Sequence, residues 1–216
     1  MSLKSPMEAA KTRLCKELRE MQQKKPIGYV FRLIDEKDLT KWQCGIFGPP
    51  NTIYQGGYFK LIMVFPNNYP YAPPTVKFTP PLFHPNVYTD GNICLSILHP
   101  PTNDPQSGEK IEERWSPIQT VDSVMISIVS MLDAPNISSP ANVEASKMYK
   151  EWKEKGKLDY VNKIKSQIES SKADAALDKV KVPVTDDEYC AKPKTSSDVS
   201  DWTLTDSEYH TSDEEQ

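Results

Sequence analysis

Apolar residues recur at helical spacing near the start of the chain. Residues 5–24 carry one at every third or fourth position, with lysine and glutamate between them. The apolar positions are Met7, Ala10, Leu14, Leu18 and Met21. This spacing predicts an amphipathic helix that buries one face and ends before Pro26.

The pattern changes between residues 29 and 79, where aromatic and β-branched residues gather in short segments. Clusters of glycine, proline and asparagine separate these segments, as at residues 48–51 and 66–68. The segments are residues 29–35, 41–47, 58–65 and 75–79. Short apolar runs joined by turns of this size predict an antiparallel meander of four strands.

Helical spacing returns after residue 120 in three segments. The first, residues 121–132, is apolar enough to lie under the sheet, and Thr120 is its predicted N-cap. The second is predicted to begin at Ser139-Pro140, with serine as N-cap, and to end near Gly156. The third is predicted over about 158–172. One helix, a four-stranded meander and three further helices predict an α+β fold.

The charge of the chain is distributed unevenly. Its 216 residues are 38% hydrophobic, which suffices for one domain with a core. The net charge is −4, but residues 186–216 contain ten acidic residues and two lysines, so the first 185 residues carry +4. We therefore predict a folded domain at residues 1–172 and an acidic extension at 173–216, disordered from about residue 186.

Cysteine usage and hydropathy indicate an intracellular protein. The chain has no apolar run of about 18 residues, so no membrane span is predicted. Residues 1–6 lack the apolar core of a signal peptide. The four cysteines are far apart and form no Cys-x-x-Cys pair, which indicates thiols rather than a disulfide framework. They are Cys15, Cys44, Cys94 and Cys190.

Cys94 is the candidate nucleophile. It follows the rigid step His84-Pro85-Asn86 and the turn-forming pair Asp90-Gly91, which together predict an ordered, non-helical shelf near the surface. A thiolate there attacks and leaves readily, and the Asn86 amide could donate to an oxyanion. The alternatives are that Cys94 is a buried, inert thiol and that Asn86 only braces the turn.

His84 and His99 supply two weaker alternatives. His84 could act as the base of a thiol protease, but a histidine before proline at a loop corner more often holds the backbone by hydrogen bonds. A zinc site formed by His84, Cys94 and His99 would have irregular spacing and no pair of cysteines. No metal is therefore predicted.

The His84-Pro85-Asn86 triplet, followed eight residues later by the cysteine of Cys94-Leu95-Ser96-Ile97-Leu98, resembles the active-site signature of ubiquitin-conjugating enzymes. The resemblance covers residues 7–172 and implies that the folded domain is catalytic. It implies that an activating enzyme, using ATP, passes ubiquitin to Cys94 as a thioester. A lysine of a substrate or of another ubiquitin then accepts it, for proteasomal degradation. No bound cofactor, nucleic acid or membrane is expected, and the location implied is cytoplasm and nucleus.

Further positions carry the same resemblance. Tyr71 is similar to the exposed aromatic residue of a loop that ubiquitin ligases grip, and Ser116-Pro117 resemble the second ligase-facing loop. Trp115, beside them, is expected in the core. Ser139 stands where many relatives have an acidic residue that gates the incoming lysine, although a helix N-cap is the alternative. Tyr88 is expected to line the same mouth.

An acidic insertion at residues 100–114 separates the cysteine segment from Trp115. It resembles the class of ubiquitin-conjugating enzymes that partners cullin–RING (SCF) ligases and builds ubiquitin chains. Its acidic residues are expected to orient a basic acceptor, and the alternative is a solvated loop with no role. They are Asp104, Glu109, Glu112 and Glu113.

The acidic extension is expected to steer the chain toward a basic groove on such a ligase. Thr211 and Ser212 precede three acidic residues, a context in which phosphorylation would add further negative charge. The alternative is a tail that only improves solubility.

Two rival functions remain open beside ubiquitin transfer. One is conjugation of a different ubiquitin-like modifier, which the same fold and cysteine would serve. The other is a catalytically dead binding module, which would have no need of Cys94 together with Asn86. A thiol protease is less favoured, since the sequence offers it no persuasive base.

Overall fold

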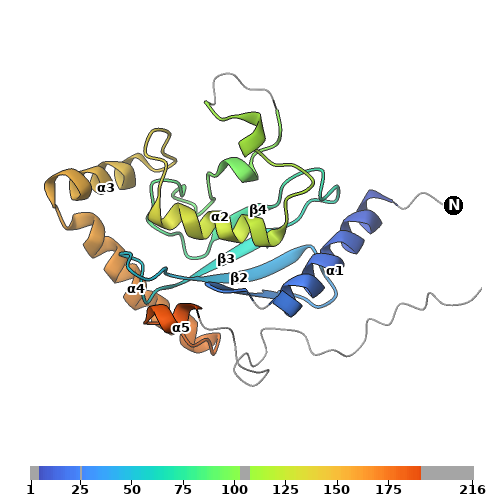
Figure 1. Cartoon of the computed structure of the whole chain (residues 1–216), viewed down its shortest axis with the longest axis horizontal. Helices are drawn as coiled ribbons and strands as arrows, with labels where there is room; N and C mark the ends of the chain where they lie inside the picture. Colours follow the sequence, from blue (N-terminus) through green and yellow to red (C-terminus); the bar gives the residue numbers. More distant parts are fainter. Residues whose placement is uncertain (1–4, 25, 103–107, 191–216) are drawn as a thin grey trace, which may run out of the picture.

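The computed structural model, shown in Figure 1, describes residues 5–24, 26–102 and 108–190. Its elements are one helix, four strands, two short 3₁₀ helices and four further helices, the last of them a single short turn. The α+β fold predicted from the sequence is therefore confirmed. Two predicted features lie outside the described residues. They are Asp104 of the insertion and the extension from residue 191, which includes Thr211 and Ser212.

The four strands form the predicted antiparallel meander, in the order β1-β2-β3-β4. They are β1 (Tyr29–Leu33), β2 (Lys41–Phe47), β3 (Tyr58–Val64) and β4 (Thr75–Phe78). The register pairs Leu33 with Trp42, and Trp42 with Met63. Because side chains alternate between the two faces of a strand, this register places the large apolar residues of neighbouring strands on one face.

Two helices are fixed to this apolar face and to each other. Helix α2 (Val121–Asp133) begins at the predicted N-cap, where the Thr120 hydroxyl accepts from the Ser123 amide at 3.2 Å. Helix α1 (Pro6–Lys24) contributes the buried Glu17. One carboxylate oxygen of Glu17 accepts from the Val121 amide at 2.7 Å, and the other lies 2.5 Å from Arg13 Nε. A negative charge thus satisfies the amide at the start of α2.

Helix α3 (Val143–Lys155) begins later than the sequence predicts. Its N-cap is Asn142, whose side chain accepts from the Ala145 amide at 3.0 Å, so the prediction of Ser139 as N-cap is wrong. Asn142 also donates its amide to the Pro85 carbonyl at 2.9 Å, which ties the start of α3 to the His-Pro-Asn step. The predicted end at Gly156 is confirmed, with φ at +67°.

Helix α4 (Asp159–Leu177) continues five residues past its predicted end. The reason is packing on the second face of the sheet, where Ala175 contacts Phe47 and Tyr58, and residues 180, 182 and 189 add to the cluster. Asp178 joins this face through an ion pair with Arg32 at 3.2 Å. Residues 186–190, predicted to be disordered, form the short helix α5 (Asp186–Cys190). The packed chain therefore continues beyond residue 172.

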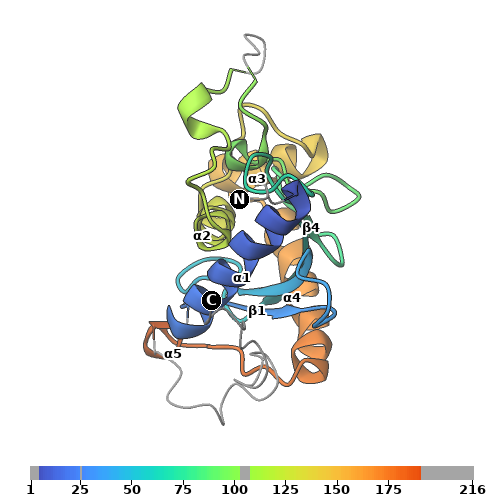
Figure 2. The same cartoon turned by 90° about the vertical axis from the view of Figure 1, so that its right-hand side faces the viewer.

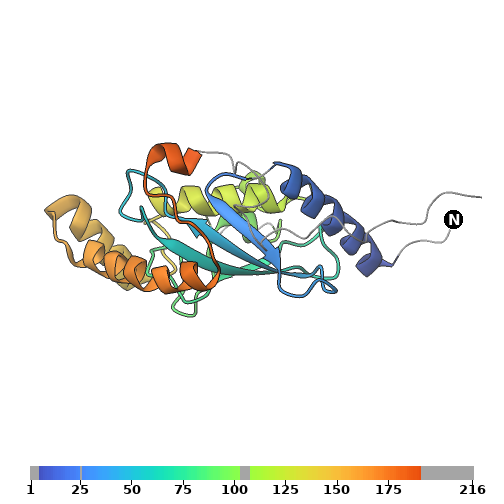
Figure 3. The same cartoon turned by 90° about the horizontal axis from the view of Figure 1, so that it is seen from below.

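The elements divide the molecule into distinct sides. Figures 1 and 3 show α1 at one end of the sheet and α3 at the other, with α4 running from that end along the sheet. The short helices η1 (Ser96–Leu98) and η2 (Ile111–Glu113) lie on the α2 side, whereas α5 lies on the opposite side of the sheet (Figures 1 and 2). The segment that carries Cys94 is therefore separated from α5 by the sheet.

Candidate active site

Cys94 lies at the end of a hydrogen-bonded loop. Its amide donates to the Asn86 carbonyl at 2.9 Å, and the Tyr88 amide donates to the Asn92 carbonyl at 2.9 Å. The predicted turn at Asp90-Gly91 is present: Gly91 has φ at +95°, and a Cβ there would lie 2.4 Å from the Phe78 carbonyl oxygen. Only glycine meets both conditions, and the turn aligns Cys94 with Asn86.

The thiol of Cys94 is partly exposed, in contrast to Cys44. Burial raises the pKa of the Cys44 thiol to about 12, which makes it an inert core cysteine. Cys15 is partly buried on α1, and Cys190 is exposed on α5. The accessibility of Cys94 agrees with a nucleophile and disagrees with a core thiol.

Cys94 and Asn86 share the wall of a cavity of about 760 Å³. The loop after α2, including Asn136 and Ser139, lines it as well, as does Glu113 of η2. Ser139 is exposed at this cavity rather than at a helix end. A cavity of this size next to a thiol can hold an extended peptide end and an incoming side chain.

The Asn86 side chain is almost wholly buried and is bonded at both ends to the backbone of Asn136. Its Nδ2 donates to the Asn136 carbonyl at 2.8 Å, and its Oδ1 accepts from the Asn136 amide at 2.8 Å. Asn86 therefore braces the loop after α2. The alternative stated from the sequence was a brace of the local turn only. An amide NH₂ has two hydrogens, so one remains for an oxyanion.

His84 holds the backbone of this site. Its Nδ1 accepts from the Asn86 amide at 3.0 Å, which leaves Nε2 to donate to the Met131 carbonyl at 3.1 Å. Burial lowers the pKa of His84 to about 3, so the ring stays neutral at neutral pH. With both nitrogens occupied, His84 can serve neither as a general base nor as a zinc ligand.

Acidification from pH 7 to pH 4.5 should destabilise the fold through His84. The folded pKa is lowered to about 3, whereas an unfolded histidine titrates near about 6.5. As pH falls between these values the unfolded chain binds a proton that the folded chain excludes, so stability is full above the upper value and is lost toward the lower one. The expected loss from this group at pH 4.5 is about 3 kcal/mol of unfolding free energy, measured by urea denaturation.

The control for this prediction is His84→Gln, which cannot titrate and should lose that share of the pH dependence. An NMR titration of wild type, with the His84 ring still neutral at pH 5, checks the same point if the variant folds poorly. Equal pH dependence in both proteins would contradict the assignment.

Tyr88 is exposed at the rim beside Cys94. The negative charge of an ionised Cys94 and a hydrogen bond to its sulfur raise the pKa of the Tyr88 phenol. Tyr88 therefore lies within reach of any group bound to the sulfur, and its place at the mouth of the site stays a prediction.

The acidic insertion turns one of its carboxylates inward. Both oxygens of Glu109 lie 2.9 Å from His99 Nδ1, and one also accepts from the Ser96 hydroxyl at 2.9 Å. Glu112 and Glu113 on η2 are exposed. The His99 ring, considered in the sequence only as a zinc ligand, is thus held between the insertion and Cys94, whose sulfur is 4.0 Å from Nε2. The sequence did not predict the contact between His99 and Cys94, because a spacing of five residues across a 3₁₀ turn is not a recognisable motif.

Tyr71 and the 116–117 loop are brought together by Trp115. The indole of Trp115 is buried, as predicted, and its Nε1 donates to the Pro70 carbonyl at 2.7 Å. Tyr71 is 73% exposed, and the following Ile118, which the sequence did not single out, is 84% exposed. Arg13 on α1 donates to the Gln119 carbonyl at 3.1 Å, so α1 borders this apolar surface.

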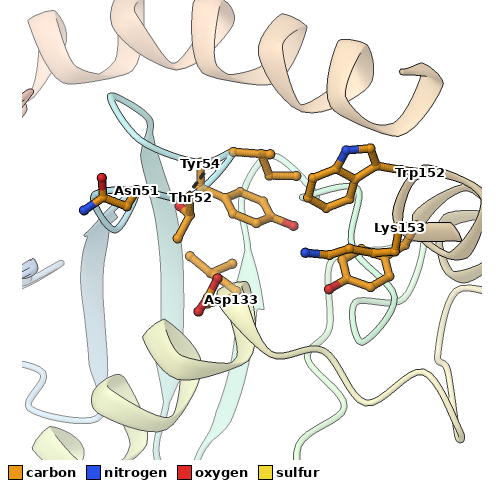
Figure 4. Close-up of a pocket in the computed structure, with 9 residues that line it drawn as sticks. Asn51, Thr52, Tyr54, Asp133, Trp152 and Lys153 are labelled. Carbon is orange, nitrogen blue, oxygen red and sulfur yellow. Dashed lines mark hydrogen bonds between the residues drawn. The ribbon is translucent and has the colours of Figure 1, made fainter. Parts of the chain in front are cut away.

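A second cavity, of about 400 Å³, lies between the end of α2, α3 and the loop at residues 51–54 (Figure 4). Lys153 already occupies part of it, with its ammonium 4.3 Å from the centre of the Trp152 ring. Tyr54 on the opposite wall bonds the Tyr160 hydroxyl at 2.7 Å. The residues of this cavity include no cysteine or histidine, and their contacts fit the packing of α3.

Residues 5–24, 26–102 and 108–190 contain no group of three or more histidine, cysteine, aspartate or glutamate side chains placed to hold a metal ion. No helix in the described part of the chain is long and apolar enough to cross a membrane.

Comparisons with known proteins agree with this geometry. A family model described as ubiquitin-conjugating enzyme matches residues 13–166. Ubiquitin-conjugating enzyme E2 7 of Arabidopsis thaliana is 52% identical over 142 residues, which cover 66% of this chain and 84% of that protein. Probable ubiquitin-conjugating enzyme E2 7 of Caenorhabditis elegans is 45% identical over 145 residues, which cover 67% and 88%.

A solved structure shows the same fold. The structure of human ubiquitin-conjugating enzyme E2 G1 superposes with a TM-score of 0.52 at 42% sequence identity, covering 62% of this chain and 100% of that chain. The family model spans well over half of the chain, including the cysteine segment, both loops beside Trp115 and α2. The chain therefore belongs to the ubiquitin-conjugating enzyme family and is a transferase of the ubiquitin conjugation pathway.

Proposed function

We propose that Cys94 carries ubiquitin as a thioester and that the chain passes it to lysines of substrates or of ubiquitin, together with a cullin–RING ligase, to mark proteins for degradation. Family membership implies ubiquitin, an activating enzyme and a ligase as partners in general. The observation that carries the proposal is the partly exposed Cys94 thiol on the wall of a large cavity that it shares with the Asn86 amide.

Charging needs a thiol that can exchange with the thioester of the activating enzyme. The ATP is consumed by that enzyme, and the chain itself is proposed to bind no cofactor. The Cys94 sulfur attacks the carbonyl carbon of the ubiquitin C-terminus and the activating enzyme's thiolate leaves, so the new bond is again a thioester.

Discharge needs a neutral amine next to that thioester. A lysine that enters past Ser139 and Tyr88 loses part of its hydration, which lowers its pKa. When the amine attacks, negative charge develops on the carbonyl oxygen. The remaining Nδ2 hydrogen of Asn86 is proposed to meet this charge, since its other hydrogen is bound to Asn136.

The acidic insertion supports the choice of a ligase class and of a lysine acceptor. Glu112 and Glu113 are exposed, and Glu113 lines the cavity of Cys94, so both face a route by which a basic acceptor would approach. Glu109 is engaged with His99 and Ser96, and we assign it a positioning role in place of the acceptor-orienting role expected from the sequence.

Glu112→Gln with Glu113→Gln should slow ubiquitin–ubiquitin synthesis about tenfold while charging of Cys94 stays unchanged, because charge steering acts on the acceptor and not on the nucleophile. The measurement is discharge of pre-charged enzyme to ubiquitin at low and at high salt. The matched control is Glu36→Gln with Glu154→Gln, two exposed acids outside the insertion. If both double variants discharge at the same rate, the insertion does not orient the acceptor.

The ligase is proposed to dock on Tyr71, Ser116, Pro117 and the neighbouring face of α1. Support comes from the exposed apolar side chains of Tyr71 and Ile118, which the bond between Trp115 and Pro70 holds on one surface. Exposed aromatic and aliphatic residues on a rigid support are typical anchors of protein–protein interfaces.

The decisive experiment is incubation of the purified chain with ubiquitin, ATP and a ubiquitin-activating enzyme, followed by a non-reducing gel. A ubiquitin adduct that disappears with thiol is expected. Parallel reactions with other ubiquitin-like modifiers and their own activating enzymes test the rival modifier, since charging by one of these alone would replace ubiquitin. No adduct with any modifier would indicate a binding module.

A further inference from the structure

His99 forms a continuous line of contacts with Cys94 and Glu109. Its Nε2 is 4.0 Å from the Cys94 sulfur, and its Nδ1 is 2.9 Å from each carboxylate oxygen of Glu109. Its carbonyl accepts from the Trp115 amide at 3.0 Å, which fixes the backbone as well. The turn η1 returns the chain toward Cys94, so two residues five apart in sequence face each other.

Glu109 is itself held in place. The Ser96 hydroxyl donates to it at 2.9 Å, and Arg114 Nε lies 3.2 Å from it. Arg114 is buried and also donates from its guanidinium to the Thr102 carbonyl at 2.7 Å. Partial burial acts to raise the pKa of Glu109, but hydrogen bonds from His99 and Ser96 with the charges of His99 and Arg114 lower it on balance.

This arrangement fixes the tautomer of His99. An ionised Glu109 only accepts hydrogen bonds, so the proton of a neutral His99 ring sits on Nδ1 and the lone pair of Nε2 points toward the sulfur. In this arrangement the carboxylate orients the histidine, and the histidine can act as a base beside the thiol nucleophile. His84 offers no such lone pair, since both of its nitrogens are bonded to the backbone.

We propose that His99, oriented by Glu109, is the proton carrier of Cys94 in ubiquitin transfer. The inference rests on the function proposed above and adds to it a residue that handles the protons. In discharge, the lysine ammonium loses one proton to solvent and the amine attacks the thioester carbonyl. The nitrogen of the resulting adduct gives a second proton to Nε2. As the C–S bond breaks, Nε2 returns that proton to the Cys94 thiolate, so the products are an amide, a thiol and one released proton.

Charged and polar groups from several elements face His99. Glu109 contacts the Nδ1 side of the His99 ring at 2.9 Å, and Arg114 Nε lies 3.2 Å from Glu109. On the sulfur side lie Cys94 and the Tyr88 phenol, and Glu113 lines the same cavity. Proton transfer through His99 uses the Nε2 lone pair, which the contact of Nδ1 with Glu109 leaves facing the sulfur.

The test is single-turnover discharge of pre-charged enzyme to free lysine, without ligase, from pH 6 to pH 9. His99→Gln should be about 100-fold slower at pH 7, at the lower end of what general acid–base catalysis contributes. The deficit should shrink toward pH 9, where hydroxide can take the adduct proton in place of Nε2. Glu109→Gln should show a smaller deficit with the same pH trend. His210→Gln, a change of one of the two other histidines, is the matched control and should follow wild type.

Chemical rescue separates proton transfer from a structural role. In His99→Ala, added imidazole should restore discharge in a concentration-dependent way, whereas a residue that only pins the insertion gives no rescue. A pH-independent deficit in His99→Gln together with no imidazole rescue in His99→Ala would overturn the proposal. Charging of wild type in the same experiment tests the proposed function independently. If wild type forms the thioester and discharges it to lysine, but the His99 variants show none of these effects, only the role of His99 is disproved.

Discussion

Cys94→Ser should abolish the thiol-sensitive ubiquitin adduct and replace it with an ester that resists thiol. The serine oxygen attacks the same carbonyl in the same cavity, but an alkoxide is a much poorer leaving group than a thiolate. Ubiquitin is therefore expected to accumulate on the substituted hydroxyl and to discharge to lysine below the limit of detection. The measurement is a gel run with and without reducing agent, followed by a discharge assay with added lysine.

The matched control is Cys190→Ser, which changes an exposed cysteine on α5, across the sheet from the site. It should charge and discharge as wild type does. If Cys94→Ser still forms an adduct that thiol removes, another cysteine is the nucleophile and the assignment of the active site is incorrect.

Asn86→Ala should slow discharge of charged enzyme to lysine by about 10²–10³-fold, the usual cost of removing one oxyanion donor. Charging should be affected far less, because the oxyanion contact is expected to matter mainly in the aminolysis step. The substitution also leaves the amide and carbonyl of Asn136 without their present partner, so a loss of about 1–3 kcal/mol of unfolding free energy is expected in parallel. Discharge rates and urea denaturation together measure both effects.

Thr120→Ala is the control for lost stability. It removes the N-cap of α2, worth about 1 kcal/mol, without touching Asn86, Asn136 or Cys94. An oxyanion role requires that discharge fall in Asn86→Ala and remain normal in Thr120→Ala. If Asn86→Ala discharges to lysine at the wild-type rate, the side chain is only a brace for the loop after α2.

Local chemistry explains why much of the fold was predictable from sequence. The strand segments are rich in aromatic and β-branched residues and lie between strong turn formers, and the register pairs them as a meander. Thr120 and Gly156 are recognisable helix ends because a hydroxyl cap and a left-handed glycine act within one turn of the chain. Ser139-Pro140 looked equally good as a start, but the backbone bond from Asn142 to Pro85 moved the start of α3 three residues onward.

In the candidate site, too, short-range features were predictable from sequence and contacts between distant segments were not. The spacing of Asn86 and Cys94 is a short-range property, since the turn at Gly91 alone brings them together. The hydrogen bond from the Asn86 side chain to Asn136 joins residues 50 positions apart, so no local sequence pattern predicts it. This bond shows that the amide braces a distant loop, whereas the sequence could only offer a brace of the local turn as an alternative.

The sequence by itself determined the element types, the nucleophile candidate and the family, because periodicity, turn chemistry and a short motif are properties of neighbouring residues. Only the tertiary structure decided how Glu109, His99 and Cys94 align, since that depends on the contacts that Glu109 makes with η1 and with His99. It also decided that α4 continues to Leu177, because the residues it packs against, Phe47 and Tyr58, lie more than a hundred positions away. Contacts between distant segments depend on the packing of the whole chain, which no local pattern encodes.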